Sequence, residues 1–117
     1  MQRRLVLLGS LAVATAVHAA PSEAERARIE RLIAFVAAQK DIQFVRNGTA
    51  YGAADAAKFL RGKFEKMGEH VGTAQQFIDQ IASRSSTSGQ PYLIRFTDGR
   101  TVPAAQFLGD ELRRMDR

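Results

Sequence analysis

The stretch IQFVRNGTAY, residues 42–51, decides the fold of this chain. Its first five residues are rich in Ile, Phe and Val, which favour a pleated, half-buried strand. Asn47-Gly48 then favours a two-residue hairpin turn, because both turn positions need a positive φ that these residue types accept readily. Residues 49–51 would return as a second strand. The stretch therefore predicts a tight β-hairpin.

A second hairpin is predicted towards the C-terminal end of the sequence. Pro91 introduces YLIRF, residues 92–96, which has the same strand-like composition. Asp98-Gly99 supplies the turn residues, and residues 101–102 return briefly. Together the two hairpins predict one antiparallel sheet.

Capping signals mark two helices. Ser22 and Glu25 form a capping box, and apolar residues at helical spacing follow, so residues 23–38 predict an amphipathic helix. Thr73 and Gln76 form a second capping box, which predicts a helix of about ten residues.

Two further helices follow the hairpins. Gly52 and Gly68 bound the first, and Pro103 is expected at the first position of the second. The apolar stripe expected to be buried is Ala53, Ala57, Leu60, Phe64 and Met67 in the first, and Phe107, Leu108, Leu112 and Met115 in the second. The order α-ββ-α-α-ββ-α predicts a single small α+β domain, with helices packed on an antiparallel sheet.

The first nineteen residues have the pattern of an export signal. Arg3 and Arg4 form a positive head, residues 5–17 are apolar, and Val17-His18-Ala19 places small residues where a signal peptidase cuts. The apolar run is too short to span a bilayer, which needs roughly 20 residues. We expect cleavage after Ala19, a single periplasmic domain of residues 20–117, and no stable membrane insertion after cleavage.

The net charge and the cysteine content argue against a nucleic-acid partner and exclude disulfide bonds. Seventeen Lys and Arg stand against twelve Asp and Glu, a formal net charge of +5 that falls to +3 without Arg3 and Arg4. The basic residues are dispersed, whereas nucleic-acid binders usually show a clustered basic stripe, so no nucleic-acid partner is expected. The chain has no Cys, so the exported domain must be held by packing alone.

Catalytic groups are few. Outside the leader His70 is the single imidazole, a zinc site generally needs three protein ligands, and no dense acidic loop for calcium is present. No metal or cofactor is therefore expected. Paired carboxylates could serve glycoside hydrolysis, although capping and solvated faces account for Glu23, Glu25, Asp55, Asp110 and Glu111. A small hydrolase of an envelope substrate, using His70 or a carboxylate pair, is the alternative to a binding module.

The polar loop around SSTSG, residues 85–89, is the strongest candidate for binding. Its hydroxyls and N–H groups could hold an anion, or they could bond the loop's own backbone. Arg46 and Lys63, both expected at the surface, would add positive charge. The candidate ligand-binding residues are Arg46, Tyr51, Lys63, Arg84, Ser85, Ser86, Ser88, Gly89 and Arg95. We expect a non-catalytic module for an envelope component or a small anionic ligand.

Several of these motifs together resemble one family of small exported bacterial proteins. They are FVRNG (residues 44–48), FIDQIASRSSTSGQPYLIR (residues 77–95) and the Asp98-Gly99 turn. The resemblance covers roughly residues 27–115 and is to domain-of-unknown-function family 5329. It implies export and a single domain, and it assigns no activity.

The resemblance also implies a strand pairing. Members of the family often carry cysteines at the positions of Ile42 and Phe96, and bridged residues have Cα atoms about 4.4–6.8 Å apart. Two apolar residues at these positions would keep the contact without the bond. The strands of residues 42–45 and 92–96 are therefore expected side by side, with Ile42 near Phe96.

Overall fold

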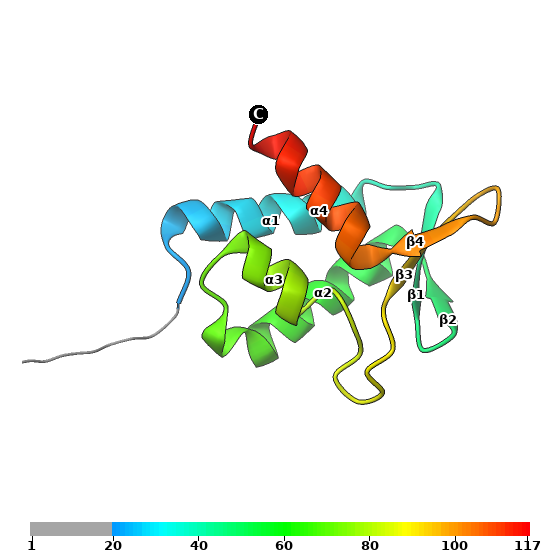
Figure 1. The fold of residues 1–117 in the computed structure, drawn as a ribbon, viewed down its shortest axis with the longest axis horizontal. Helices are drawn as coiled ribbons and strands as arrows, with labels where there is room; N and C mark the ends of the chain where they lie inside the picture. The colour runs from blue at the N-terminus through cyan, green and yellow to red at the C-terminus, as the bar shows by residue number, and fades with distance from the viewer. Residues whose placement is uncertain (1–19) are drawn as a thin grey trace, which may run out of the picture.

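The computed structural model of the protein describes residues 20–117 (Figure 1). The predicted leader, including its cleavage point after Ala19, lies outside the described residues. The elements are α1 (Glu23–Ala37), β1 (Ile42–Arg46), β2 (Thr49–Tyr51), α2 (Ala53–Met67), the 3₁₀ helix η2 (Gly68–His70), α3 (Ala74–Gln80), β3 (Leu93–Phe96), β4 (Thr101–Pro103) and α4 (Ala104–Met115). The predicted α+β class and element order are confirmed. Within residues 20–117 no helix is both long and apolar enough to cross a membrane.

The two hairpins form one four-stranded antiparallel sheet in the order β2-β1-β3-β4. The pairing of β1 with β3 joins them at the centre. Ile42 lies directly opposite Phe96, and Phe44 lies opposite Ile94. The predicted contact between Ile42 and Phe96 is confirmed.

The turns differ in length. Asn47 and Gly48 have φ values of 52° and 80° and make the predicted two-residue turn. Residues 97–100 connect β3 to β4, so this connection is longer than the Asp98-Gly99 pair alone. There only Gly99 has a positive φ, and the Asp98 carboxylate accepts a hydrogen bond from the Arg100 N–H.

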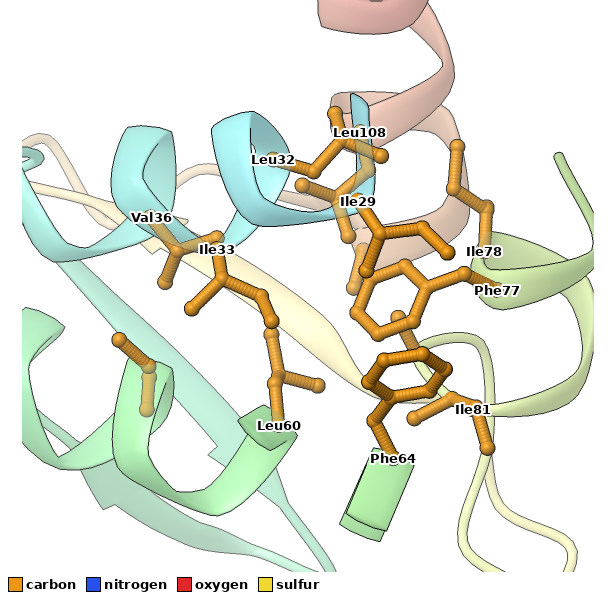
Figure 2. Packing of buried hydrophobic residues seen from close by; sticks show 14 of the residues in the cluster. Ile29, Leu32, Ile33, Val36, Leu60, Phe64, Phe77, Ile78, Ile81 and Leu108 are labelled. Atoms are coloured by element: carbon orange, nitrogen blue, oxygen red, sulfur yellow. The ribbon is translucent and has the colours of Figure 1, made fainter. Parts of the chain in front are cut away.

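The helices lie to one side of the sheet and share one core with it (Figure 1). Figure 2 shows the apolar side chains of α1, α2 and α3 meeting in this core. The rings of Phe64 and Phe77 meet edge to face with centroids 5.5 Å apart. From the sheet, Phe44 packs on Phe59 of α2 and on Tyr92, with ring centroids 6.2 and 5.1 Å away.

Two helix boundaries differ from the predictions. α3 has seven residues instead of about ten, because the Ser83 hydroxyl donates to the Asp79 carbonyl and the Ser83 carbonyl accepts from Tyr92. Pro103 is the last residue of β4 and the N-cap of α4, one position before the first helical residue. Its extended backbone, with ψ of 139°, keeps it paired with Leu93.

The predicted stripe of α2 is wrong at one end. Met67 is 49% exposed, whereas Lys63, expected at the surface, is 8% exposed. Ala57, Leu60 and Phe64 are buried as predicted. The buried face of α2 therefore includes a charged residue, Lys63, and does not extend to Met67.

Glu25 stabilises two helices at once. The Ser22 hydroxyl accepts from the Glu25 N–H, as the capping box predicts. The Glu25 carboxylate does not return to Ser22. It accepts from the Ala74 N–H at 2.8 Å, at the start of α3, and pairs with Arg28. The Ala74 hydrogen bond and then Arg28 hold the pKa of Glu25 below its ordinary value of 4.5.

We expect the Glu25→Gln variant to be less stable than the wild type at pH 7, by about 0.5–1 kcal/mol, the scale of exposed ion pairs. Because the pKa of Glu25 is lowered by folding, its contribution is present above pH 4.5 and is lost as the pH falls below that value. Urea unfolding of both proteins at pH 7 and pH 3 measures the difference. A difference that grows on acidification would contradict this role.

Candidate functional site

A cavity of about 360 Å³ opens between α2, the end of β1 and the polar loop of residues 85–89, which we call the serine loop. Its lining residues are Arg46, Lys58, Phe59, Gly62, Lys63, Lys66, Met67, Ser85, Ser86, Thr87 and Tyr92. Four of these are cations, and no Asp or Glu is among the lining residues in the described part of the chain. Three of the other lining residues, Ser85, Ser86 and Thr87, carry hydroxyl groups, and most of the exposed lining surface is apolar. We call this cavity the cationic pocket.

α2 forms one wall of the cationic pocket through two neighbouring rows of side chains. Lys58, Gly62 and Lys66 are spaced four residues apart, and Phe59 and Lys63 form the adjacent row. Residues four apart lie one above another on a helix. The spacing thus places the charges and the apolar contacts on one helix face.

Lys63 lies at the inner end of the pocket. Its ammonium donates hydrogen bonds of 2.9 Å to the Arg84 carbonyl and to the Tyr92 hydroxyl. Both acceptors are uncharged, and no carboxylate pairs with Lys63 within residues 20–117. Burial, and secondly the nearby Arg46, lowers the pKa of Lys63. The charged form of Lys63 is therefore incompletely compensated.

Arg46 stands at the end of β1, over aromatic rings. Its guanidinium carbon lies 4.5 Å from the centroid of Phe59 and 5.6 Å from that of Tyr51. Tyr51 thus supports Arg46 without lining the pocket itself. The Arg46 Nε is buried and has no hydrogen-bond partner among the described residues. Arg46 therefore brings charge to the pocket without a carboxylate beside it.

The serine loop is held mainly by its own hydroxyls. The Ser85 hydroxyl accepts from the N–H groups of Thr87 and Ser88, each at 3.2 Å. Asn47 of the hairpin turn donates to Ser85 and accepts from the Ser88 hydroxyl. This corresponds to the self-bonded alternative for Ser85 and Ser88. Of the predicted serines, Ser86 stays exposed on the pocket wall.

The remaining candidates lie outside the pocket lining. Arg84 contributes its carbonyl to Lys63, and Gly89 has a φ of 76° in the loop turn. Arg95 lies opposite Gln43 in the sheet, one position from the buried Ile94. Since neighbouring strand residues face opposite ways, Arg95 lies on the face away from Arg46.

The groups of the alternative hydrolase are also outside the cationic pocket. His70 is exposed in η2. Several carboxylates pair with arginines, namely Glu25 with Arg28, Asp110 with Arg113, and Glu111 with Arg114. None of these residues lines the pocket.

Sequence reasoning missed seven lining residues of the cationic pocket, namely Lys58, Phe59, Gly62, Lys66, Met67, Thr87 and Tyr92, of which the first five lie on α2. The available signal for those five was their spacing on one helix face together with Lys63, which was predicted. It also missed Asn47 as the residue that ties the serine loop to the hairpin.

The fold and the pocket define a small α+β domain with a cationic, partly apolar cavity. The chain belongs to the family of unknown function DUF5329, which it matches over residues 23–116, as the resemblance predicted. It is similar to the uncharacterized protein YfeK of Salmonella typhimurium (strain LT2), with 44% identity over 68 residues. That match covers 58% of this chain and 57% of the relative, so it spans little more than half of either protein. No solved structure matches the chain.

Proposed function

We propose that this protein is a non-catalytic binding module of the bacterial envelope that holds an anionic group of its ligand in the cationic pocket. The ligand is a small anionic molecule or an envelope component that carries such a group. The observation that supports the proposal most directly is a cavity that Arg46, Lys58, Lys63 and Lys66 line and to which no carboxylate of residues 20–117 contributes.

The energetics of Lys63 favour this proposal. A buried ammonium without an opposite charge loses hydration that its two neutral hydrogen-bond acceptors replace only in part. An anion in the pocket would supply the missing charge and would raise the lowered pKa of Lys63. Burial also raises the pKa of Tyr92, which keeps its hydroxyl protonated and neutral beside the ligand.

A second hollow of the domain shows that the charge of the pocket is distinctive. That hollow, of about 320 Å³, includes Arg26 and Arg61 but also Glu30, Glu65 and Glu69. Arg61 pairs with Glu30 there. The carboxylates of this hollow thus partly neutralise its arginines. It is therefore a weaker candidate for anion binding than the cationic pocket.

Inorganic phosphate is a suitable first probe, followed by amide chemical shifts in NMR. We expect shifts confined to β1, α2 and the serine loop, and weaker binding as salt is added, because exposed charges are screened beyond about 8 Å. In the Lys58→Ala/Lys66→Ala variant the phosphate affinity should fall roughly 2- to 30-fold, given about 0.2–1 kcal/mol for each of the two exposed pairs.

Lys40→Ala is the matched control, because Lys40 is an exposed cation at a different hollow of the surface. It should leave phosphate binding unchanged. Phosphate shifts that ignore the lysines of α2, or that respond equally to Lys40→Ala, would contradict the proposed site.

The envelope location rests on the predicted leader. Residues 1–19 have the composition of an export signal, and we propose residues 20–117 as the exported domain. The intact mass of the protein recovered from the periplasm tests this. A product that still begins at Met1 would contradict it.

A further inference from the structure

The cationic pocket contains a feature that anion binding alone does not require. Beside its charged residues, its lining includes an apolar surface to which Phe59, Gly62, Met67 and Tyr92 contribute. The Phe59 and Tyr92 rings meet edge to face with centroids 5.7 Å apart. A site for a fully hydrated inorganic anion gains little from such a surface, because burying apolar area rewards apolar ligands.

Gly62 marks the position at which this apolar surface has space for a ligand. It lies in the middle of α2, where glycine is less favourable than alanine by roughly 0.5–1 kcal/mol. A Cβ at position 62 would meet no described atom within 4 Å, and the φ of Gly62 is not positive. Neither close packing nor backbone conformation therefore accounts for the glycine. Its effect is to leave space in the pocket wall between Lys58 and Lys66, beside the row of Phe59 and Lys63.

Met67 lies at the rim of the same space. At 49% exposure it is the large hydrophobic residue left exposed in the described part of the chain. Its sulfur accepts a hydrogen bond of 3.6 Å from the Ser86 hydroxyl, another lining residue of the pocket. Methionine is flexible and polarizable, and it is common at surfaces that adapt to apolar ligands. Gly62 thus leaves room for an occupant, and the exposed Met67 favours an apolar one.

We infer that the ligand is an amphipathic anion, in which an aryl or alkyl body adjoins a phosphate or carboxylate group, and that this body lies over Gly62 between Phe59 and Met67. This inference rests on the proposed function and specifies its ligand. A cavity of about 360 Å³ is at the small end of the range for ligand pockets. The ligand, or the part of it that enters, is accordingly small.

Two pairs of probes test the inference, phenyl phosphate against inorganic phosphate and benzoate against acetate, each titrated by NMR. We expect each aromatic probe to bind at least tenfold more tightly than its partner. Tighter binding of phenyl phosphate than of benzoate would assign the anionic group as a phosphate, and the reverse as a carboxylate; both results support the inference.

Gly62→Leu places a side chain in the proposed space while leaving all four cations in place. We expect it to weaken phenyl phosphate binding at least tenfold and to change inorganic phosphate binding less than about twofold. Gly62→Ala is the control for helix propensity, and it should stay within about twofold of the wild type for both probes. The thermal midpoints of both variants should equal or exceed that of the wild type.

The outcomes separate the two proposals. Equal affinities for phenyl phosphate and inorganic phosphate would overturn the apolar body but leave anion binding intact. Tight phenyl phosphate binding that is unaffected by Gly62→Leu would overturn its position over Gly62. If none of the four probes binds, both the proposed function and this inference are wrong.

Discussion

Replacing Phe77 by alanine is expected to lower the free energy of unfolding by about 3–5 kcal/mol. Phe77 is fully buried and lies at the junction of three helices, where its ring meets that of Phe64 (Figure 2). The substitution removes the ring, leaves a cavity and breaks an aromatic pair that is itself worth about 0.5–1.5 kcal/mol. α3 has only seven residues, so its position depends on such contacts. Urea unfolding of the two proteins measures the loss.

Two further variants keep this prediction testable if Phe77→Ala fails to fold. Phe77→Leu retains most of the volume and should cost less than the alanine variant, about 1–2 kcal/mol. Met67→Ala also truncates a large apolar side chain, but an exposed one, and should stay within about 0.5 kcal/mol of the wild type. Equal costs for Phe77→Ala and Met67→Ala would contradict the core described above.

The features that sequence predicted best are those whose partners are local. Asn47 and Gly48 determine their turn through their own backbone preferences. Ser22 and Thr73 each accept from an N–H three residues ahead. A capping pattern contains both partners of such a hydrogen bond, so the sequence is sufficient to predict the start of the helix.

The reciprocal halves of the same capping boxes were not predictable. Glu25 caps α3 through Ala74, 49 residues away, and Gln76 accepts from the Gly72 N–H instead of from Thr73. In both cases another donor competes with the local one. Which donor binds the side chain depends on the tertiary packing of the chain, and a local sequence pattern does not contain that information.

Lys63 and Met67 show the same limit in the core. The helical period predicts that one face of α2 is buried. Met67 was assigned to that face because it is hydrophobic, and Lys63 was assigned to the surface because it is charged. Lys63 is buried because the Arg84 carbonyl and the Tyr92 hydroxyl, 21 and 29 residues further along the chain, accept its hydrogen bonds. No local sequence pattern indicates that Lys63 contacts these two residues.

The candidate site was predictable in part. Arg46, Lys63, Ser85 and Ser86 all line one cavity, although the reason they meet is the β1–β3 pairing. Arg95 could have been set apart from the sequence, since it follows the apolar Ile94 and strand residues alternate between faces. Residue type alone suggested the candidate ligand-binding residues, and the alternation of strand residues would have excluded Arg95 from them.

We expect the Ile42→Cys/Phe96→Cys variant to form a disulfide and to be more stable oxidised than reduced by about 2–4 kcal/mol. The two residues face each other across the central antiparallel pair, where Cα atoms are about 4.5–5.5 Å apart. That spacing falls within the range of disulfide-bonded cysteines. The bond would close a loop of about 55 residues, for which the chain-entropy relation gives about 4 kcal/mol as an upper value.

Comparing the oxidised with the reduced form of the same variant isolates the bond from the cost of losing the two apolar side chains. Phe96 contacts Phe107 and lies under Arg100, so Phe96→Cys alone should be somewhat less stable than the wild type. Urea unfolding with and without reductant gives the difference, and a thiol assay counts the free cysteines. Two free thiols after oxidation would contradict the Ile42–Phe96 register and, with it, the central pairing that brings Arg46 to the cationic pocket.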